Sequence, residues 1–300
     1  MIKFLKYKLI YLLISASILL PGFYSLFRWG INPSIDFTGG TLLELKLEES
    51  KLGNNLPAGR QGEITKLRQL VEQKEVEVNS IQSSGENTYL LRSKPIDKEK
   101  KEEIFKELEE EFGEVEEVRF ETVGPTLGKE LLRKTLYAAF LSIIAILIFI
   151  GWSFKNWRFG MAAVFALLHD FFILLGVFSL LGHFLGIEID SLFVTAALTT
   201  MSFSVHDTIV IFDRIREKTK LNPKLSFENQ ANLALTETMV RSLNNSFTIV
   251  FMLLALILLG GETIRWFIIA LLIGTLAGTY SSPFVATPVL AILQRVKKKS

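Results

Sequence analysis

Long apolar stretches separated by polar segments dominate the sequence and predict its architecture. Six stretches reach the roughly 17–25 residues that a helix needs to cross a bilayer. They are Leu9–Phe27, Leu132–Gly151, Gly160–Leu181, Ser191–Phe212, Leu243–Gly260 and Trp266–Leu293. The last one contains Pro283 and Pro288. Proline cannot continue a regular helix, so we expect this stretch to kink or to end early.

The first stretch fits either a retained helix or a signal peptide, because Lys3, Lys6 and Lys8 precede it. Its apolar core is about 19 residues long, and no small-x-small cleavage site follows it. We therefore expect an uncleaved first transmembrane helix.

A pattern of short alternations fills residues 30–130, which we call the polar domain. It predicts four strands, at Thr41–Glu48, Val76–Gln82, Asn87–Lys94 and Glu114–Thr122. Helical spacing predicts helices at Gly62–Lys74 and Lys98–Phe112, the second capped by Asp97 and ended by Gly113. The order β-α-β-β-α-β is that of a ferredoxin-like α+β domain, in which one antiparallel sheet carries two helices on one face.

Two segments need separate interpretation. Gly53–Gly62 (GNNLPAGRQG) is rich in Gly and Asn, so we expect a surface insertion without chemistry. Glu217–Val240 is the only sizeable polar segment between the later stretches. Within it, Ser226–Arg241 can form an amphipathic helix that lies at the membrane interface. Its apolar side would consist of Leu233, Leu235, Met239 and Val240.

Charge is divided unevenly between the two parts of the chain. The polar domain contains 14 Lys or Arg and 22 Asp or Glu, a net charge of −8, whereas the rest of the chain carries +10. The basic residues lie at the ends of the apolar stretches and form no single patch, so nucleic acid is not an expected partner. The positive-inside bias places both termini in the cytoplasm and the polar domain outside.

Together these patterns predict a membrane-embedded all-α bundle of six helices with an extracytoplasmic α+β ferredoxin-like domain. The expected parts are an N-terminal tail with the first helix, the polar domain, helices two to four, a cytoplasmic loop with its amphipathic helix, and helices five and six with a basic tail. Their limits are 1–29, 30–130, 131–212, 213–242 and 243–300.

Few ionisable side chains interrupt the apolar stretches, namely His169, Asp170, His206, Asp207 and, at the entry to the fifth, Arg241. A charge in hydrocarbon costs roughly 2.5–3.5 kcal/mol on insertion scales, so such a residue usually has a function. Asp207 and Arg241 would lie in the same leaflet on neighbouring helices, and a pair between them is geometrically reasonable. Burial favours a protonated carboxyl group and a nearby arginine favours the carboxylate. A movement that separates the pair would therefore let Asp207 take up a proton.

Each of these groups also has a structural interpretation. Asp207 can accept hydrogen bonds from Ser and Thr of neighbouring helices, Arg241 can extend to lipid headgroups, and Asp170 can pair with His169 in helix packing. The polar stripe Thr195, Thr199, Ser202 and His206 indicates either a hydrated path or a helix–helix contact. The GxxxG sequence from Gly274 to Gly278 favours close helix packing.

An enzyme is not expected. The chain has no cysteine, no phosphate-binding glycine loop with lysine, no nucleophile elbow and no cluster of metal-ligating residues. We therefore predict neither a metal nor a cofactor, and the energy source must be external.

Four motifs occur in order along the chain: Ser34–Thr41 (SIDFTGGT), Val123–Leu131 (VGPTLGKEL), His169-Asp170 and Ser204–Glu217 (SVHDTIVIFDRIRE). With six spans, they resemble the SecF family, the smaller half of the SecD–SecF protein-export complex in the resistance–nodulation–division superfamily. The resemblance implies that SecD and the SecYEG channel are partners and that the proton-motive force drives completion of preprotein export. YajC- or YidC-like proteins, the translocating preprotein and membrane lipid are further expected partners.

The resemblance also assigns roles to residues. It implies a proton relay of Asp207 and Arg241, with His206 and Asp170 as further candidates. The remaining motif residues are a motif or hinge group, consisting of Asp36, Gly39, Gly40, Gly124, Pro125 and Gly128, and a cytoplasmic group, consisting of Asp213, Arg214, Arg216 and Glu217. The implied location is the cytoplasmic (inner) membrane of a bacterium or archaeon.

The chain departs from the family pattern at His206, where the family commonly has Asn. The pH response cannot therefore be transferred directly, and sodium could use the same carboxylate as a proton. Two other functions stay open: a self-contained exporter of lipid or small molecules, and a non-transporting assembly factor. An exporter is disfavoured because about 100 polar residues are too few to build a substrate tunnel.

Overall fold

The computed structural model describes residues 3–47, 60–85 and 87–296. It divides into two compact units, a helical bundle formed by Met1–Asn32 with Leu136–Ser300, and the polar domain at Pro33–Thr135. The sequence placed the limits of the polar domain at residues 30 and 130.

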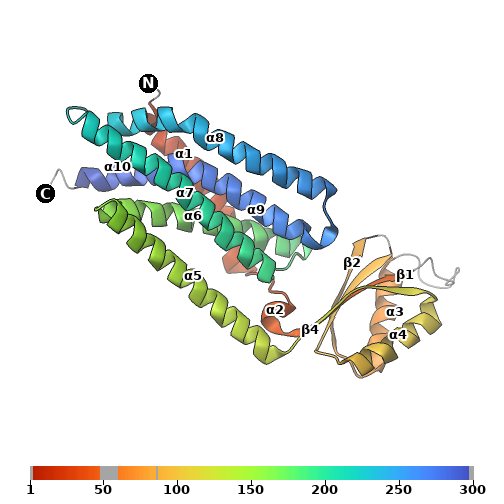
Figure 1. Ribbon diagram of the computed structural model, residues 1–300. Coiled ribbons are helices and arrows are strands. Elements are labelled where there is room, and N and C mark those ends of the chain that lie inside the picture. Colours follow the sequence, from red (N-terminus) through yellow and green to blue (C-terminus); the bar gives the residue numbers. More distant parts are fainter. Residues whose placement is uncertain (1–2, 48–59, 86, 297–300) are drawn as a thin grey trace. The chain divides into compact units, whose positions relative to one another are not determined.

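Six helices are long and apolar enough to cross a membrane, as predicted (Figure 1). A 3-10 turn at Phe4–Tyr7 leads into the first. The helices are α1 (Lys8–Arg28), α5 (Pro125–Ser153), α6 (Trp157–Leu185), α7 (Ser191–Leu221), α8 (Phe227–Leu259) and α9 (Glu262–Ser281).

The last span is interrupted where its prolines lie. Helix α9 passes into a π-helical turn, η2 (Ser282–Ala286), which contains Pro283, and continues as α10 (Thr287–Val296). Because proline has no backbone N–H, it removes one bond of the regular helix. The prediction of an irregularity here is confirmed, and π-helical turns often occur at functional sites.

The segment between α7 and α8 differs from the expectation. In the described chain, no separate interfacial helix follows Ser226; instead residues 227–241 form the first turns of the continuous helix α8. Ala231, Ala234 and Leu235 are fully buried there, whereas Val240 is exposed. The four residues predicted to form one apolar side do not share one face. Leu235 lies on the buried side of α8 with the small residues Ala231 and Ala234, whereas Val240 lies on the exposed side.

Small residues let pairs of helices approach closely. A Cβ on Gly274 would come within 2.5 Å of Thr200, and a Cβ on Gly278 within 2.8 Å of Ser204. These contacts join α9 to α7 and confirm that the GxxxG sequence serves close packing.

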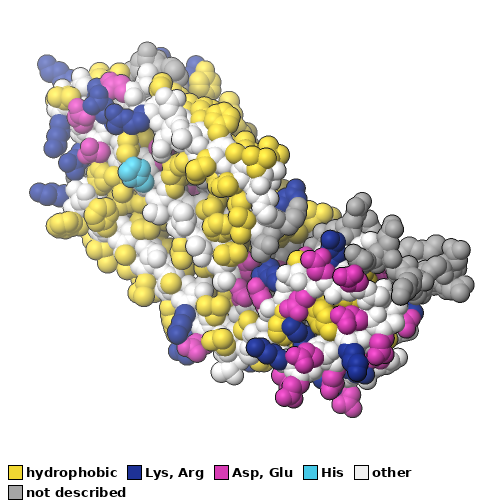
Figure 2. All heavy atoms as spheres, turned by 45° about the vertical axis from the view of Figure 1, so that its right-hand side comes forward, with side chains coloured by type: hydrophobic (Ala, Val, Ile, Leu, Met, Phe, Trp, Pro, Cys, Tyr) yellow, Lys and Arg dark blue, Asp and Glu magenta, His cyan; other side chains and the backbone are white. Residues whose placement is uncertain are grey.

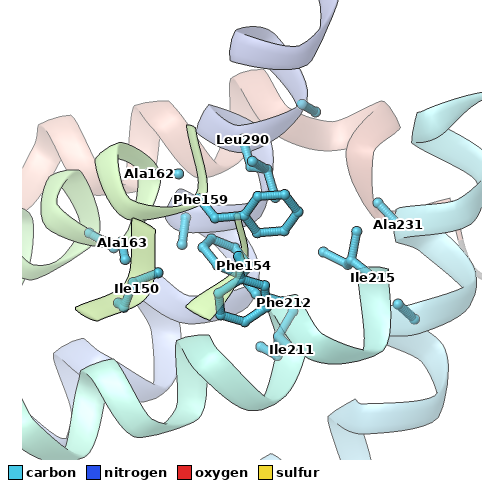
Figure 3. Packing of buried hydrophobic residues seen from close by; sticks show 14 of the residues in the cluster. Ile150, Phe154, Phe159, Ala162, Ala163, Ile211, Phe212, Ile215, Ala231 and Leu290 are labelled. Carbon is cyan, nitrogen blue, oxygen red and sulfur yellow. The ribbon is translucent and has the colours of Figure 1, made fainter. Parts of the chain in front are cut away.

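Aromatic side chains hold one end of the bundle together (Figure 3). Phe154, at the end of α5, stacks on Phe159 of α6 at 5.0 Å between ring centroids. Phe212 of α7 meets Phe159 edge-on at 5.2 Å. Leu290 of α10 and Ala231 of α8 belong to the same buried cluster, so this core packs five of the spans against one another.

The polar domain has the predicted β-α-β-β-α-β order, with a short extra helix before it. Its elements are α2 (Ile35–Thr38), β1 (Gly40–Leu47), α3 (Arg60–Gln73), β2 (Val78–Gly85), β3 (Thr88–Ser93), α4 (Lys98–Phe112) and β4 (Val115–Val123). The strand order β2-β3-β1-β4 and its antiparallel pairing confirm the ferredoxin-like arrangement. Helices α3 and α4 contribute Leu67 and Leu108 to its buried core.

The predicted start and end of helix α4 in the polar domain are confirmed. The Asp97 side chain caps α4 by accepting from the backbone N–H of Lys100 at 2.9 Å. Gly113 ends that helix with a φ of +90°. The expected insertion Gly53–Gly62 lies outside the described residues up to position 59, and α3 begins at Arg60.

Candidate functional site

Asp207 is buried in the middle of the helical bundle. It lies on α7 with 6% of its surface exposed. The hydroxyl groups of Ser242 on α8 and Ser282 on the π-helical turn interact with its carboxyl group. Its Oδ2 atom is buried and has no hydrogen-bond partner among the described residues. A buried carboxyl oxygen without a donor is costly when ionised, and it suits the reversible uptake of a proton or a small cation.

Arg241 does not contact Asp207 in this structure. Among the described residues it forms no ion pair, and its side chain is exposed. The reason is helical geometry: Ser242, the next residue, faces Asp207, and successive residues on a helix point about 100° apart. The predicted direct pair is therefore wrong for this conformation, while a role for Arg241 in another conformation stays a prediction.

His206 and the polar stripe of α7 face outward. Thr195, Thr199, Ser202 and His206 are all exposed. The threonine hydroxyls donate to backbone carbonyls one turn earlier, with Thr199 Oγ1 lying 2.7 Å from the Thr195 oxygen. This chain by itself thus encloses no hydrated path along the stripe, and the stripe forms a polar surface on an apolar helix.

Asp170, the second buried carboxylate, is saturated with donors. It lies on α6 with 5% of its surface exposed. Its Oδ2 accepts from Ser204 on α7 and from Ser281 on α9, both at 2.6 Å. Its Oδ1 lies 3.0 Å from Nδ1 of His169. The predicted Asp170–His169 contact is confirmed, and serines of two further helices complete it.

The serine pair Ser281-Ser282 connects the two carboxylates. Ser281 donates to Asp170, and Ser282 interacts with Asp207. The Ser282 hydroxyl also lies 2.9 Å from the hydroxyl of Thr208, the residue after Asp207. Sequence reasoning missed Ser281, Ser282 and Ser204; the available signal was a Ser-Ser pair immediately before Pro283 in an otherwise apolar span.

Residues of the cytoplasmic group form contacts between helices in this conformation. Arg214 pairs with Glu217 on its own helix and with Glu237 on α8. Arg216 donates to the backbone oxygen of Ser153 at 3.2 Å and lies over the ring of Phe154. Arg216 also lies 3.8 Å from Asp213. These contacts hold the end of α7 against α8 and the α5–α6 turn.

The motif or hinge residues come together within the polar-domain unit. A Cβ on Gly39 would come within 2.6 Å of Pro125, and one on Gly128 within 3.0 Å of the Phe37 oxygen. Gly40, with a φ of +138°, lies against the Ser93 backbone. Asp36 is part of α2, and Gly124 has open space around it. The two motifs therefore form one contact, at which the chain enters and leaves the domain.

No group of three or more His, Cys, Asp or Glu side chains that could hold a metal ion occurs in the part of the chain that the structure describes. The buried polar side chains that the structure describes in the bundle carry carboxyl, hydroxyl, carboxamide and imidazole groups.

Comparison with known proteins identifies the family. The sequence model described as "Protein export membrane protein SecD/SecF, C-terminal" matches residues 101–296, and the "SecD/SecF GG Motif" matches residues 24–51. The chain belongs to the SecD/SecF family of protein export membrane proteins.

Within that family, the chain is similar to SecF over almost its full length. It is 38% identical to the protein translocase subunit SecF of Thermobaculum terrenum, with 97% of this chain and 93% of the relative covered. It is 37% identical to SecF of Anaerolinea thermophila, with 97% and 94% covered. The crystal structure of SecDF, a translocon-associated membrane protein from Thermus thermophilus, matches with a TM-score of 0.82 and 29% identity, covering 98% of this chain and 39% of that one.

Proposed function

We propose that this chain is the SecF subunit of a preprotein translocase and that it couples export to an ion gradient through Asp207. Its full-length similarity to SecF subunits supports the export role. The observation that carries the coupling is the buried Oδ2 atom of Asp207, which has no partner among the described residues. Such an oxygen in a membrane span is poised to receive a proton.

The coupling uses two states of Asp207. Burial favours the protonated form of the carboxyl group, and a nearby arginine favours the ionised form. A rotation of α8 that replaces Ser242 by Arg241 at the carboxyl group would release the proton. A membrane potential of 100 mV supplies about 2.3 kcal/mol per charge, which shifts an equilibrium between two conformations by about 50-fold.

The orientation we propose has both termini in the cytoplasm and the polar domain outside. Figure 2 shows Lys and Arg side chains gathered at one end of the bundle. Lys155 lies between α5 and α6, and Lys218 and Lys220 lie in the last turn of α7. In Figure 1 the α5–α6 turn and the end of α7 lie at the same end of the bundle. Clustered positive charge at one end of a bundle is typical of its cytoplasmic side.

A SecD-like protein is the partner that we propose for the polar surface of the bundle. Arg241, Asn244 and Asn245 on α8 are exposed, and within the described chain their side chains make no hydrogen bond. With the α7 stripe, they form a surface that is poorly suited to lipid tails. In the SecDF of Thermus thermophilus, this chain matches 36% of the sequence, so a fused protein carries further chain that could cover such a surface. SecYEG, YajC- or YidC-like proteins and the preprotein complete the proposed assembly.

The decisive experiment replaces Asp207 by Asn, which keeps the size and removes the titration. The chain, a SecD-like partner and the Sec channel are reconstituted in vesicles, and completion of preprotein translocation is followed with and without an imposed proton gradient. We expect D207N to lose the stimulation by the gradient. Glu102→Gln, which alters an exposed carboxylate on α4 outside the motifs, is the control and should retain it.

Full gradient-driven export by D207N would defeat the coupling role. Stimulation by a sodium gradient in place of a proton gradient would identify the other ion. Association with the SecD-like protein that persists while no variant changes export would support the assembly-factor alternative.

A further inference from the structure

A hydrogen-bonded chain leads from Asp170 to α1, and the coupling proposed above, through Asp207 and Arg241, does not use it. His169 lies between Asp170 and α1. Its Nδ1 is 3.0 Å from Asp170 Oδ1, and its Nε2 is 3.0 Å from the hydroxyl of Ser15 on α1. All three residues are more than 90% buried. The Ser15 hydroxyl in turn lies 3.4 Å from the hydroxyl of Tyr280, which donates to the backbone oxygen of Tyr11 on α1.

The chain of contacts can respond to a change of charge without losing a partner. When His169 is neutral, Nδ1 donates to Asp170 and Nε2 accepts from Ser15. When Nε2 also carries a proton, it donates to the Ser15 oxygen, and the Ser15 hydroxyl turns to the oxygen of Tyr280. Only one hydroxyl rotates between the two arrangements. The titratable groups that face the imidazole are Asp170 on its own helix and Tyr280 on α9.

The other end of this chain reaches the Asp207 site. Ser204 and Ser281 donate to Asp170, and their neighbours in the fold contact Asp207: the Ser282 hydroxyl lies 3.3 Å from the Ser204 backbone oxygen and interacts with the Asp207 carboxyl group. Ser281, which donates to Asp170, directly precedes the π-helical turn, so a change at Asp207 that moves the turn would also move this donor. Gly278 of α9 packs closely against Ser204 of α7, so there is little free space in which these two helices could shift independently.

Helix α1 is the place where such a change would matter. It ends at Arg28, and only residues 29–34 separate it from α2, which directly precedes Gly39 and Gly40 of the polar domain. A displacement of α1 would therefore reach that domain through a short covalent connection. Gly22 of α1 packs backbone to backbone against Gly176 of α6, so α1 and α6 are in close contact.

We propose that Asp170 and His169 are positioning residues that transmit the state of Asp207 to α1 through Ser15. This inference rests on the proposed ion coupling and adds the route by which it reaches the polar domain. Neither residue needs to exchange protons with Asp207. Their function is to keep α1 in register with the π-helical turn.

The test measures the position of α1 directly. The chain has no cysteine, so spin labels can be attached to cysteines replacing Phe27 on α1 and Leu258 on α8, which are 90% and 81% exposed. The full chain is reconstituted in lipid vesicles with its SecD-like partner, and the distance between labels is measured by pulsed EPR. We expect D207N to shift this distance by about 2 Å relative to the parent.

Ser15→Ala and Asp170→Asn should each abolish that shift. Ser15→Thr, which restores a hydroxyl group, should recover it. Ser17→Ala is the matched control on the same helix, because the Ser17 hydroxyl is exposed and, among the described residues, bonds only to the Ile14 oxygen, at 2.7 Å. It should leave the shift intact.

The inference is overturned if D207N leaves the distance unchanged, or if its shift survives both Ser15→Ala and Asp170→Asn. That outcome is distinguishable from failure of the proposed function, which requires D207N to keep gradient-driven export. Loss of export in D207N together with an unaltered α1 would remove this route and leave the coupling role of Asp207 in place.

Discussion

Gly39 lies so close to Pro125 that a methyl group on Gly39 would come within 2.6 Å of the Pro125 Cα atom. Gly39 also has a φ of +74°, which L-residues rarely adopt. Gly128, one turn into α5, completes the contact, since its own Cβ would come within 2.9 Å of the Gly39 nitrogen. Two motifs far apart in sequence therefore depend on each other.

Replacing Gly39 by Ala should destabilise the polar domain by about 2–4 kcal/mol, because it adds backbone strain to a steric clash. Hydrogen exchange of β1 and β4 in the full-length protein measures the loss as faster exchange. Gly124→Ala is the control, since no atom lies within 4 Å of the added Cβ. Equal protection in G39A and the parent would show that the contact is not needed.

Replacing Gly274 by Ala should weaken the bundle by about 1–3 kcal/mol, because the new methyl group forces α9 away from Thr200 of α7. Reversible unfolding in mixed micelles measures this change. Gly261→Ala, with open space around its Cβ, should unfold as the parent does. A G274A protein as stable as G261A would argue against tight α7–α9 packing.

Replacing Phe212 by Ala should cost about 3–5 kcal/mol, since its fully buried ring packs against Phe154 and Phe159. Thermal unfolding in detergent measures the loss. Phe165→Ala removes an equal volume from a ring that is 57% exposed and should change stability little. Similar losses of stability in both variants would mean that the cluster in Figure 3 contributes no more to the stability of the bundle than an exposed ring does.

Replacing Arg241 by Gln should reduce gradient-driven export by about tenfold or more, equivalent to at least 1.4 kcal/mol of coupling. The protein should accumulate normally, because the side chain is exposed and unpaired within the described chain. Lys220→Gln, at the exposed end of α7, removes the same charge and should export normally. Normal export by R241Q would leave Arg241 as a surface residue only.

Lys74 should make the stability of the polar domain depend on pH in the alkaline range. Its ammonium group lies 2.5 Å from Glu107 on α4, and hydrogen bonding to Glu107 raises the pKa of Lys74. A raised pKa contributes stability that is fully present below the ordinary pKa and is lost as pH rises through the raised value. The protection of α4 against hydrogen exchange, relative to the intrinsic base-catalysed rate, should therefore fall at high pH. Lys74→Arg, which stays charged, should resist that loss of protection, and equal behaviour of both proteins would disprove the contribution.

The spans and the polar domain were predictable because their signals are local. Apolar stretches of membrane length do not depend on what they contact, and alternation along Thr41–Glu48 or the cap at Asp97 involves only neighbouring residues. The exception shows the limit of this reasoning. The Ser226–Arg241 segment is helical as expected, but its surroundings, with Ala231 and Leu235 buried in the bundle, made it part of α8.

The sequence by itself determined which residues could carry charge inside the membrane, because the cost of burying a carboxylate is independent of the fold. Only the tertiary structure decided which side chains meet. It placed Ser242, and not Arg241, against Asp207, and it gathered Ser204 and Ser281 around Asp170. Those contacts depend on helix rotation and on the π-helical turn, where one residue of register turns a side chain by about 100°.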